Sequence, residues 1–110
     1  MPKAKLSNYK KDLFSDLADP QYAAQYLAMA LGDSREEFLL ALKDVAESRN
    51  MSAVAKTANL NRESLYRMLS RSGNPTLSSL TSILNAFGLR LTIQPVIESG
   101  PKRERRTPSA

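Results

Sequence analysis

The sequence predicts a small all-α domain that ends in one β-strand. Apolar residues recur at helical spacings of three and four through most of the chain before Gly88, and after it the spacing changes to alternation. The length of 110 residues allows one modest hydrophobic core. We therefore expect one domain over residues 19–97, a basic amphipathic segment over residues 1–18, and a disordered basic tail over residues 98–110.

The first helix of this domain is expected from Asp19 to Leu31. Asp19 is a good N-cap residue, and Pro20 suits the first helical position because its missing N–H is not needed there. One stripe of the helix is apolar and consists of Ala23, Tyr26, Leu27 and Ala30.

A second helix is expected from Ser34 to Arg49. Its first residues predict a capping box, in which Ser34 accepts from the Glu37 N–H and the Glu37 side chain reaches back. Leu40 falls on the charged face, where it can mark the seat of the preceding segment or of a partner. The predicted core face consists of Phe38, Leu39, Leu42, Val45, Ala46 and Arg49.

The stretch from Met51 to Ser70 predicts two short helices joined by a very short link. Ser52 can cap the first helix, and the second follows from Asn61. Ala55 is small where the two helices cross, and Asn59 tolerates the left-handed backbone that a tight turn needs. This pattern is typical of a helix-turn-helix. The inward residues are Met51, Val54, Ala55, Ala58, Leu65, Met68 and Leu69.

The opposite face of the second short helix is polar and is the candidate DNA-binding surface. Arg can grip guanine through two hydrogen bonds, Glu can accept from cytosine and Asn can pair with adenine. Ser52 and Lys56 of the first helix are placed to hold phosphates. The alternative is an ordinary two-helix corner with solvated arginines. The candidate DNA-binding residues are Ser52, Lys56, Asn61, Arg62, Glu63, Tyr66, Arg67, Ser70 and Arg71.

The last predicted helix runs from Leu77 to Phe87, with Thr76 as N-cap and Gly88 as a left-handed stop. Alternation then predicts a strand that ends at Pro95, and no other segment of the sequence predicts a partner strand. Because an unpaired strand exposes its backbone polar groups, we expect it to pair with its copy in a homodimer, or else to be covered by the N-terminal segment. The candidate dimerisation residues are Leu89, Leu91 and Ile93.

The net charge of +5 is divided unevenly along the chain. Residues 1–11 carry +4, residues 12–48 carry eight acids against two bases, and residues 49–71 carry five bases against one acid. Neighbouring blocks of opposite sign favour two partners of opposite charge, because long-range fields speed association with a complementary surface. The alternative is two solvated faces.

Composition excludes several classes of function. The chain has no Cys and no His, so it offers no disulfide or thiolate metal site, and we expect a cytoplasmic protein without a cofactor or a metal. Adjacent acids such as Glu36 and Glu37 point about 100° apart on a helix, which argues against a metal-dependent nuclease and against an enzyme. No apolar run approaches the ~20 residues of a membrane span. RNA binding is disfavoured because no exposed aromatic platform is predicted.

Two stretches of the sequence resemble a known protein family. AVAKTANLNRESLYRMLS, followed by SGNPTLSSLTSILNAFGLRLTIQP, resembles the HigA-like, prophage addiction-module antidotes, a branch of the lambda-repressor-like helix-turn-helix proteins. The resemblance covers about residues 19–95, and its most specific parts are RESLYRMLS, GNPTL and FGLRLTIQP. Family members often have Gly where this chain has Asn50 and Asn59.

The resemblance implies a compact five-helix DNA-binding domain that dimerises and represses its own operon. It also implies an antitoxin of a type II toxin-antitoxin module whose partner is a basic RelE/HigB-like toxin. The acidic block is then the expected toxin surface, contacted through residues 6–31, and the basic middle block the expected operator surface. The alternative is a stand-alone phage-type repressor without a toxin. Aromatic and apolar anchors for the toxin are expected at Tyr9, Leu13, Phe14, Tyr22 and Tyr26.

Overall fold

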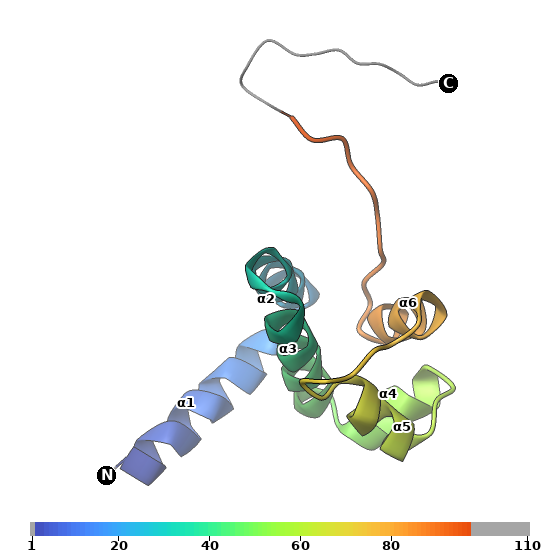
Figure 1. Ribbon diagram of the computed structural model, residues 1–110. Coiled ribbons are helices and arrows are strands. Elements are labelled where there is room, and N and C mark those ends of the chain that lie inside the picture. Colours follow the sequence, from blue (N-terminus) through green and yellow to red (C-terminus); the bar gives the residue numbers. More distant parts are fainter. Residues whose placement is uncertain (1, 98–110) are drawn as a thin grey trace, which may run out of the picture.

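The computed structural model describes residues 2–97, with side chains from Tyr9 onward, and this part of the chain is all-helical with six helices (Figure 1). The predicted all-α class is confirmed, whereas the expected number of five helices is wrong because residues before Asp19 form a further helix. The predicted tail over residues 98–110 lies outside the described residues. The helices are α1 (Pro2–Leu17), α2 (Pro20–Asp33), α3 (Arg35–Ser48), α4 (Met51–Thr57), α5 (Arg62–Met68) and α6 (Leu77–Ala86).

Helix α1 projects away from the other helices, and its C-terminal part joins the core (Figure 1). Leu17 is fully buried, while Leu13 and Phe14 are half-buried against the core. The described side chains before Leu13 are exposed. The helix is therefore held to the domain by its last turns.

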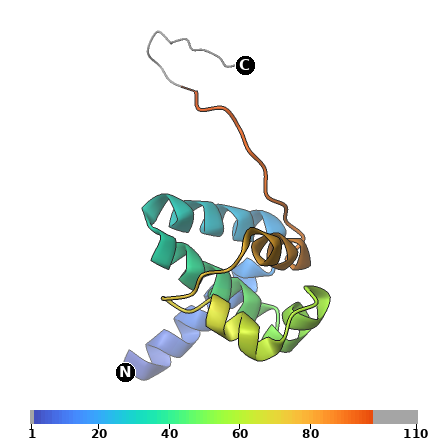
Figure 2. The ribbon, with the colours of Figure 1, turned by 45° about the vertical axis from the view of Figure 1, so that its right-hand side comes forward.

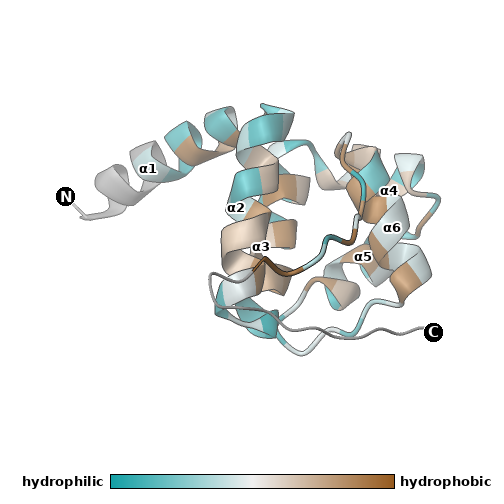
Figure 3. Ribbon diagram, turned by 90° about the horizontal axis from the view of Figure 1, so that it is seen from above, coloured by the Kyte–Doolittle hydropathy of each residue, from teal (hydrophilic) through white to brown (hydrophobic). Residues whose placement is uncertain are grey.

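Helices α2 and α3 lie side by side and are separated in sequence by Ser34 alone. The predicted caps form: Asp19 Oδ1 accepts from the Gln21 N–H at 3.1 Å, and Ser34 Oγ accepts from the Glu37 N–H at 3.0 Å. The second half of the predicted capping box is replaced, because the Ser34 N–H donates to the Ala30 carbonyl at the end of α2. The hydropathy colouring shows hydrophobic and hydrophilic residues alternating along these helices, as in amphipathic helices (Figure 3).

Helix α4 begins two residues earlier than its predicted cap, Ser52, allows. Asn50, at φ 77°, is the N-cap, and its Oδ1 accepts from the Ala53 N–H at 3.1 Å. The prediction of Ser52 as cap is therefore wrong, because the amide of Asn50 already closes the first turn in which Ser52 lies. Asn59 is left-handed at φ 60°, as predicted, and it ends the turn into α5.

Helix α6 has the predicted ends, with Thr76 Oγ1 accepting from the Ser79 N–H at 3.0 Å and Gly88 at φ 83°. The predicted strand after Gly88 is wrong for the single chain: residues 89–97 are extended but form no strand within the described residues. A strand requires ladder hydrogen bonds to a neighbour, and this segment leaves the helices with no other extended segment of the described residues beside it (Figures 1 and 2).

Arg49, which directly follows α3, is half-buried and bonds to the C-terminal ends of two other helices. Its Nη1 donates to the Phe87 carbonyl at 3.0 Å and its Nη2 to the Leu17 carbonyl at 3.1 Å. These carbonyls end α6 and α1, so both helix C-termini meet the same positive charge. The guanidinium also lies 5.7 Å from the centre of the Phe87 ring. The predicted place of Arg49 on the inner face of α3 is confirmed.

Candidate functional site

Helices α4 and α5 form a corner with a small buried residue at its centre. Ala55 is buried, as the sequence predicts, and its carbonyl accepts from the Leu60 N–H at 2.8 Å, which turns the chain toward α5. Leu65 of α5 and Leu69 directly after it are fully buried. These side chains thus fix the orientation of α5 on the core.

The outward face of α5 carries Arg62, Glu63, Tyr66 and Arg67, all exposed. The Arg62 guanidinium lies 5.6 Å from the centre of the Tyr66 ring, an arrangement in which the ring holds the cation at the helix surface. Arg67 Nη2 donates to Ser64 Oγ at 3.2 Å, one turn earlier. Both arginines keep most of their N–H donors free for an outside acceptor.

The remaining predicted DNA-binding residues surround this face, and two of them have other partners. Asn61 Oδ1 accepts from the Glu63 N–H at 2.8 Å and the Ser64 N–H at 3.2 Å, so Asn61 is the N-cap of α5 and only its amide NH₂ is free. Ser70 is half-buried and donates to the Arg67 carbonyl at 2.8 Å. Three more residues are exposed on the same corner and its exit: Ser52, Lys56 and Arg71.

The loop after α5 is held by residues that the sequence did not single out. Arg35, at the start of α3, donates through Nη2 to the Gly73 carbonyl at 2.6 Å and to Asn74 Oδ1 at 3.0 Å. Gly73 is buried, and a Cβ at this position would overlap the Met68 carbonyl at the end of α5. The loop therefore lies directly against the end of α5. No local pattern could have predicted a contact that joins residues 38 positions apart.

The residues predicted to contact a toxin are split between α1 and α2. Tyr9 and Tyr22 are exposed, whereas Leu13 and Phe14 are half-buried against the core and offer less surface than expected. The structure brings Tyr22 together with Tyr26, because both line a cavity of about 130 Å³ on α2.

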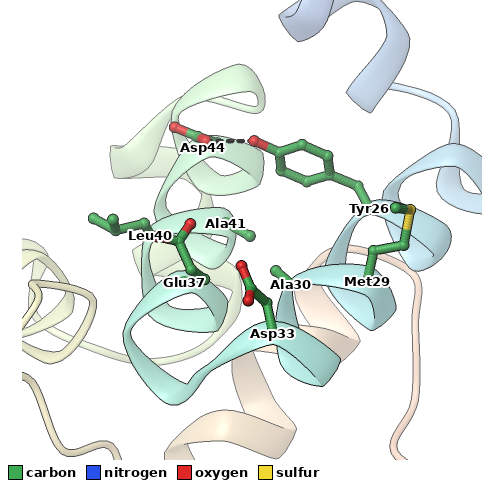
Figure 4. Close-up of a pocket in the computed structure, with 8 residues that line it drawn as sticks. All are labelled: Tyr26, Met29, Ala30, Asp33, Glu37, Leu40, Ala41 and Asp44. Atoms are coloured by element: carbon green, nitrogen blue, oxygen red, sulfur yellow. Dashed lines mark hydrogen bonds between the residues drawn. The ribbon is translucent and has the colours of Figure 1, made fainter.

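Tyr26 also faces a larger groove between α2 and α3, of about 260 Å³ (Figure 4). Its hydroxyl donates to Asp44 Oδ2 at 2.7 Å. Burial, and next the hydrogen bond to Asp44, raise the pKa of Tyr26 above its usual range. Leu40 on the charged face of α3 was the sequence signal for this groove. We call it the α2–α3 groove; it is lined by Tyr26, Met29, Ala30, Asp33, Glu37, Leu40, Ala41 and Asp44.

The predicted dimerisation residues lie on the extended segment after α6. Leu89 is half-buried, Leu91 is 46% exposed and Ile93 is 96% exposed. Val96 and Ile97 continue this exposed apolar run. Beside it, a cavity of about 210 Å³ is lined mainly by apolar side chains, namely Ala24, Leu27, Ala28, Leu31, Phe38, Leu84, Leu89 and Leu91, together with Arg90.

Within residues 2–97, no helix has both the length and the apolar character needed to cross a bilayer. In the same part of the chain, no three His, Cys, Asp or Glu side chains are grouped so that they could hold a metal ion.

Comparison with known proteins gives one family. Residues 7–95 match a family model described as "Probable addiction module antidote protein". A protein of Haemophilus influenzae that bears only the description "Uncharacterized protein" is 36% identical over 84 residues, which cover 76% of this chain and 87% of that protein. No solved structure matches the chain.

Proposed function

Because this chain belongs to the family of probable addiction module antidote proteins, we propose that it is an antitoxin that binds a RelE/HigB-like toxin and, as a sequence-specific DNA-binding dimer, represses its own operon. An antidote implies a toxin partner in general and suggests a regulatory protein rather than an enzyme. The finer parts of the proposal concern the kind of toxin, the DNA and the dimer.

We assign DNA binding to the α4–α5 corner, read as a helix-turn-helix of the lambda-repressor-like kind. The observation that carries this assignment is the division of α5: Leu65 and Leu69 are fully buried, while Arg62 and Arg67 project from its outer face. In this arrangement α5 enters the major groove, where the two guanidinium groups face base edges. Lys56 of α4 then contacts the phosphate backbone.

Dimerisation is proposed through the segment after α6. Its apolar side chains at Leu91, Ile93, Val96 and Ile97 are exposed in the single chain, and its backbone has no ladder partner there. Pairing of two such segments, each lying over the neighbouring apolar cavity, would bury these side chains and would give the backbone its hydrogen-bond partners. A two-fold dimer would also present two α5 helices to two half-sites of an operator.

The test of the DNA assignment is binding of the purified chain to the duplex that lies upstream of its own gene. We expect tighter binding to this duplex than to a random duplex of equal length and charge, measured by fluorescence anisotropy at fixed salt, because non-specific binding depends strongly on salt. Equal affinity for both duplexes would contradict sequence-specific repression.

The test of the antitoxin assignment is rescue of growth. The neighbouring reading frame is induced alone and together with this chain, and we expect growth arrest only when it is induced alone. Operator binding without rescue would instead favour the stand-alone repressor.

A further inference from the structure

We propose that the α2–α3 groove is the toxin-binding site and that it receives a basic segment of the toxin, with one Lys or Arg side chain inserted between Asp33, Glu37 and Asp44. This inference rests on the proposed antitoxin function and names the surface to which the toxin binds. The expected contact through residues 6–31 is thereby extended from α2 across to α3.

The shape of the groove suits a single long side chain. Its volume of about 260 Å³ is below the range of sites for drug-sized ligands. Ala30 and Ala41 leave it open between the helices, and Met29 and Leu40 border it with apolar surface (Figure 4). Met29 is 78% exposed, so its apolar surface is available to a partner. An aliphatic Lys or Arg stem can cover this surface while its charged head reaches the carboxylates.

The charge of the groove selects a cation. Asp33, Glu37 and Asp44 all line it, and no basic side chain of the described residues forms an ion pair with them. The Tyr26 hydroxyl orients one oxygen of Asp44, which leaves the other free to accept from a guanidinium or ammonium group.

The surface around the groove indicates a folded partner rather than a short peptide. The smaller cavity shares Tyr26 and Met29 with the groove and continues it toward the exposed Tyr22. Aromatic and Met side chains beside a charged pocket form the mixed surface on which protein partners dock. The chain's own basic run, Lys102–Arg106, is the competing occupant, and the test separates the two.

The test uses two charge reversals on one helix. Glu36 and Glu37 both lie in the first turn of α3 and are both exposed, but only Glu37 lines the groove. Glu36→Lys therefore matches Glu37→Lys in charge, helix position and helix-dipole effect. Binding of the purified toxin encoded beside this chain is measured by calorimetry. We expect Glu37→Lys to raise Kd at least about tenfold and Glu36→Lys less than about threefold.

A second readout avoids substitution altogether. Met29 is 78% exposed, whereas Met51 is 5% exposed. Peroxide oxidation followed by mass spectrometry of peptides should modify Met29 rapidly in the free chain, and toxin binding should slow that reaction at least about fivefold. Half-buried Met68, on α5, serves as the internal control and should keep its rate.

Three results would overturn the proposal. Equal losses for Glu36→Lys and Glu37→Lys, with Met29 unprotected, would place the toxin elsewhere while the antitoxin function stands. If removal of residues 98–110 exposes Met29 in the free chain and Glu37→Lys has the same effect, the occupant is the chain's own tail. If the wild-type chain neither binds the toxin nor rescues growth, the proposed function fails and this inference fails with it.

Discussion

Replacement of Arg49 by Met should destabilise the whole domain. Met keeps an unbranched apolar stem of similar length but removes the donors that reach the Phe87 and Leu17 carbonyls. These two carbonyls end α6 and α1, so the change leaves both helix ends without their shared cation. The effect should therefore extend to helices that are distant in sequence.

The magnitude follows from the contacts of the guanidinium. Each hydrogen bond to a charged group contributes about 1.5–3 kcal/mol, so two contribute about 3–6 kcal/mol. Arg49 Nε is buried without a partner, and its removal returns about 1–3 kcal/mol. The middle values of these two ranges give a net loss of about 2–3 kcal/mol in the free energy of unfolding. For a domain of this size that corresponds to a fall in Tm of roughly 10–20 °C.

Urea unfolding followed by far-ultraviolet circular dichroism measures this loss. Arg71→Met is the matched control, because Arg71 is exposed and the same charge is removed; its stability should stay within about 0.5 kcal/mol of wild type. Arg49→Lys should fall between the two, since one ammonium group keeps the charge but cannot reproduce the planar fork. An Arg49→Met variant within about 0.5 kcal/mol of wild type would refute the reasoning.

Three further predictions follow from the described contacts. Arg67→Ala should weaken binding to the specific operator by about 1–3 kcal/mol and to random duplex much less; equal losses in anisotropy titrations would mean that it contacts only phosphate. Gly73→Ala should lower Tm because its Cβ meets the α5 backbone, whereas Gly32→Ala, which meets nothing within 4 Å, should raise it slightly. Because the pKa of Tyr26 is raised above its unfolded value of about 10, its contribution is complete below that pH and is lost as pH rises further; in urea titrations the advantage of wild type over Tyr26→Phe should stay constant up to about pH 10 and shrink above it, and a constant difference above pH 10 would contradict the role of Asp44.

Local signals in the sequence predicted most of the helix ends. The predicted caps at Asp19, Ser34 and Thr76 each act within three residues, so their partners can be read from the chain itself. The cap of α4 was misplaced because Asn50 and Ser52 are both good cap residues only two positions apart. The choice between them depends on how the chain leaves α3, which no local pattern contains.

Features that depend on distant contacts could not be predicted in the same way. Among the described side chains of α1, Leu13, Phe14 and Leu17 are the ones that pack against the core, and three residues near one end are too few to form a stripe that identifies a helix. The alternation after Gly88 cannot distinguish a paired strand from an unpaired extended chain, because pairing is not a local property. The polar face of α5 could be expected from the spacing of residues along that one helix. The α2–α3 groove could not, because it forms only where two helices pack against each other.

The apolar segment over residues 89–97 should make the stability and the operator occupancy of the protein depend on its concentration. If two copies pair through this segment, dilution destabilises the fold by mass action, and the unfolding midpoint rises with protein concentration. Operator occupancy then rises with the square of the chain concentration while dimers are scarce. A small fall in the concentration of the chain would therefore have two effects. Fewer dimers would occupy the operator, and more unpaired segments would be open to aggregation.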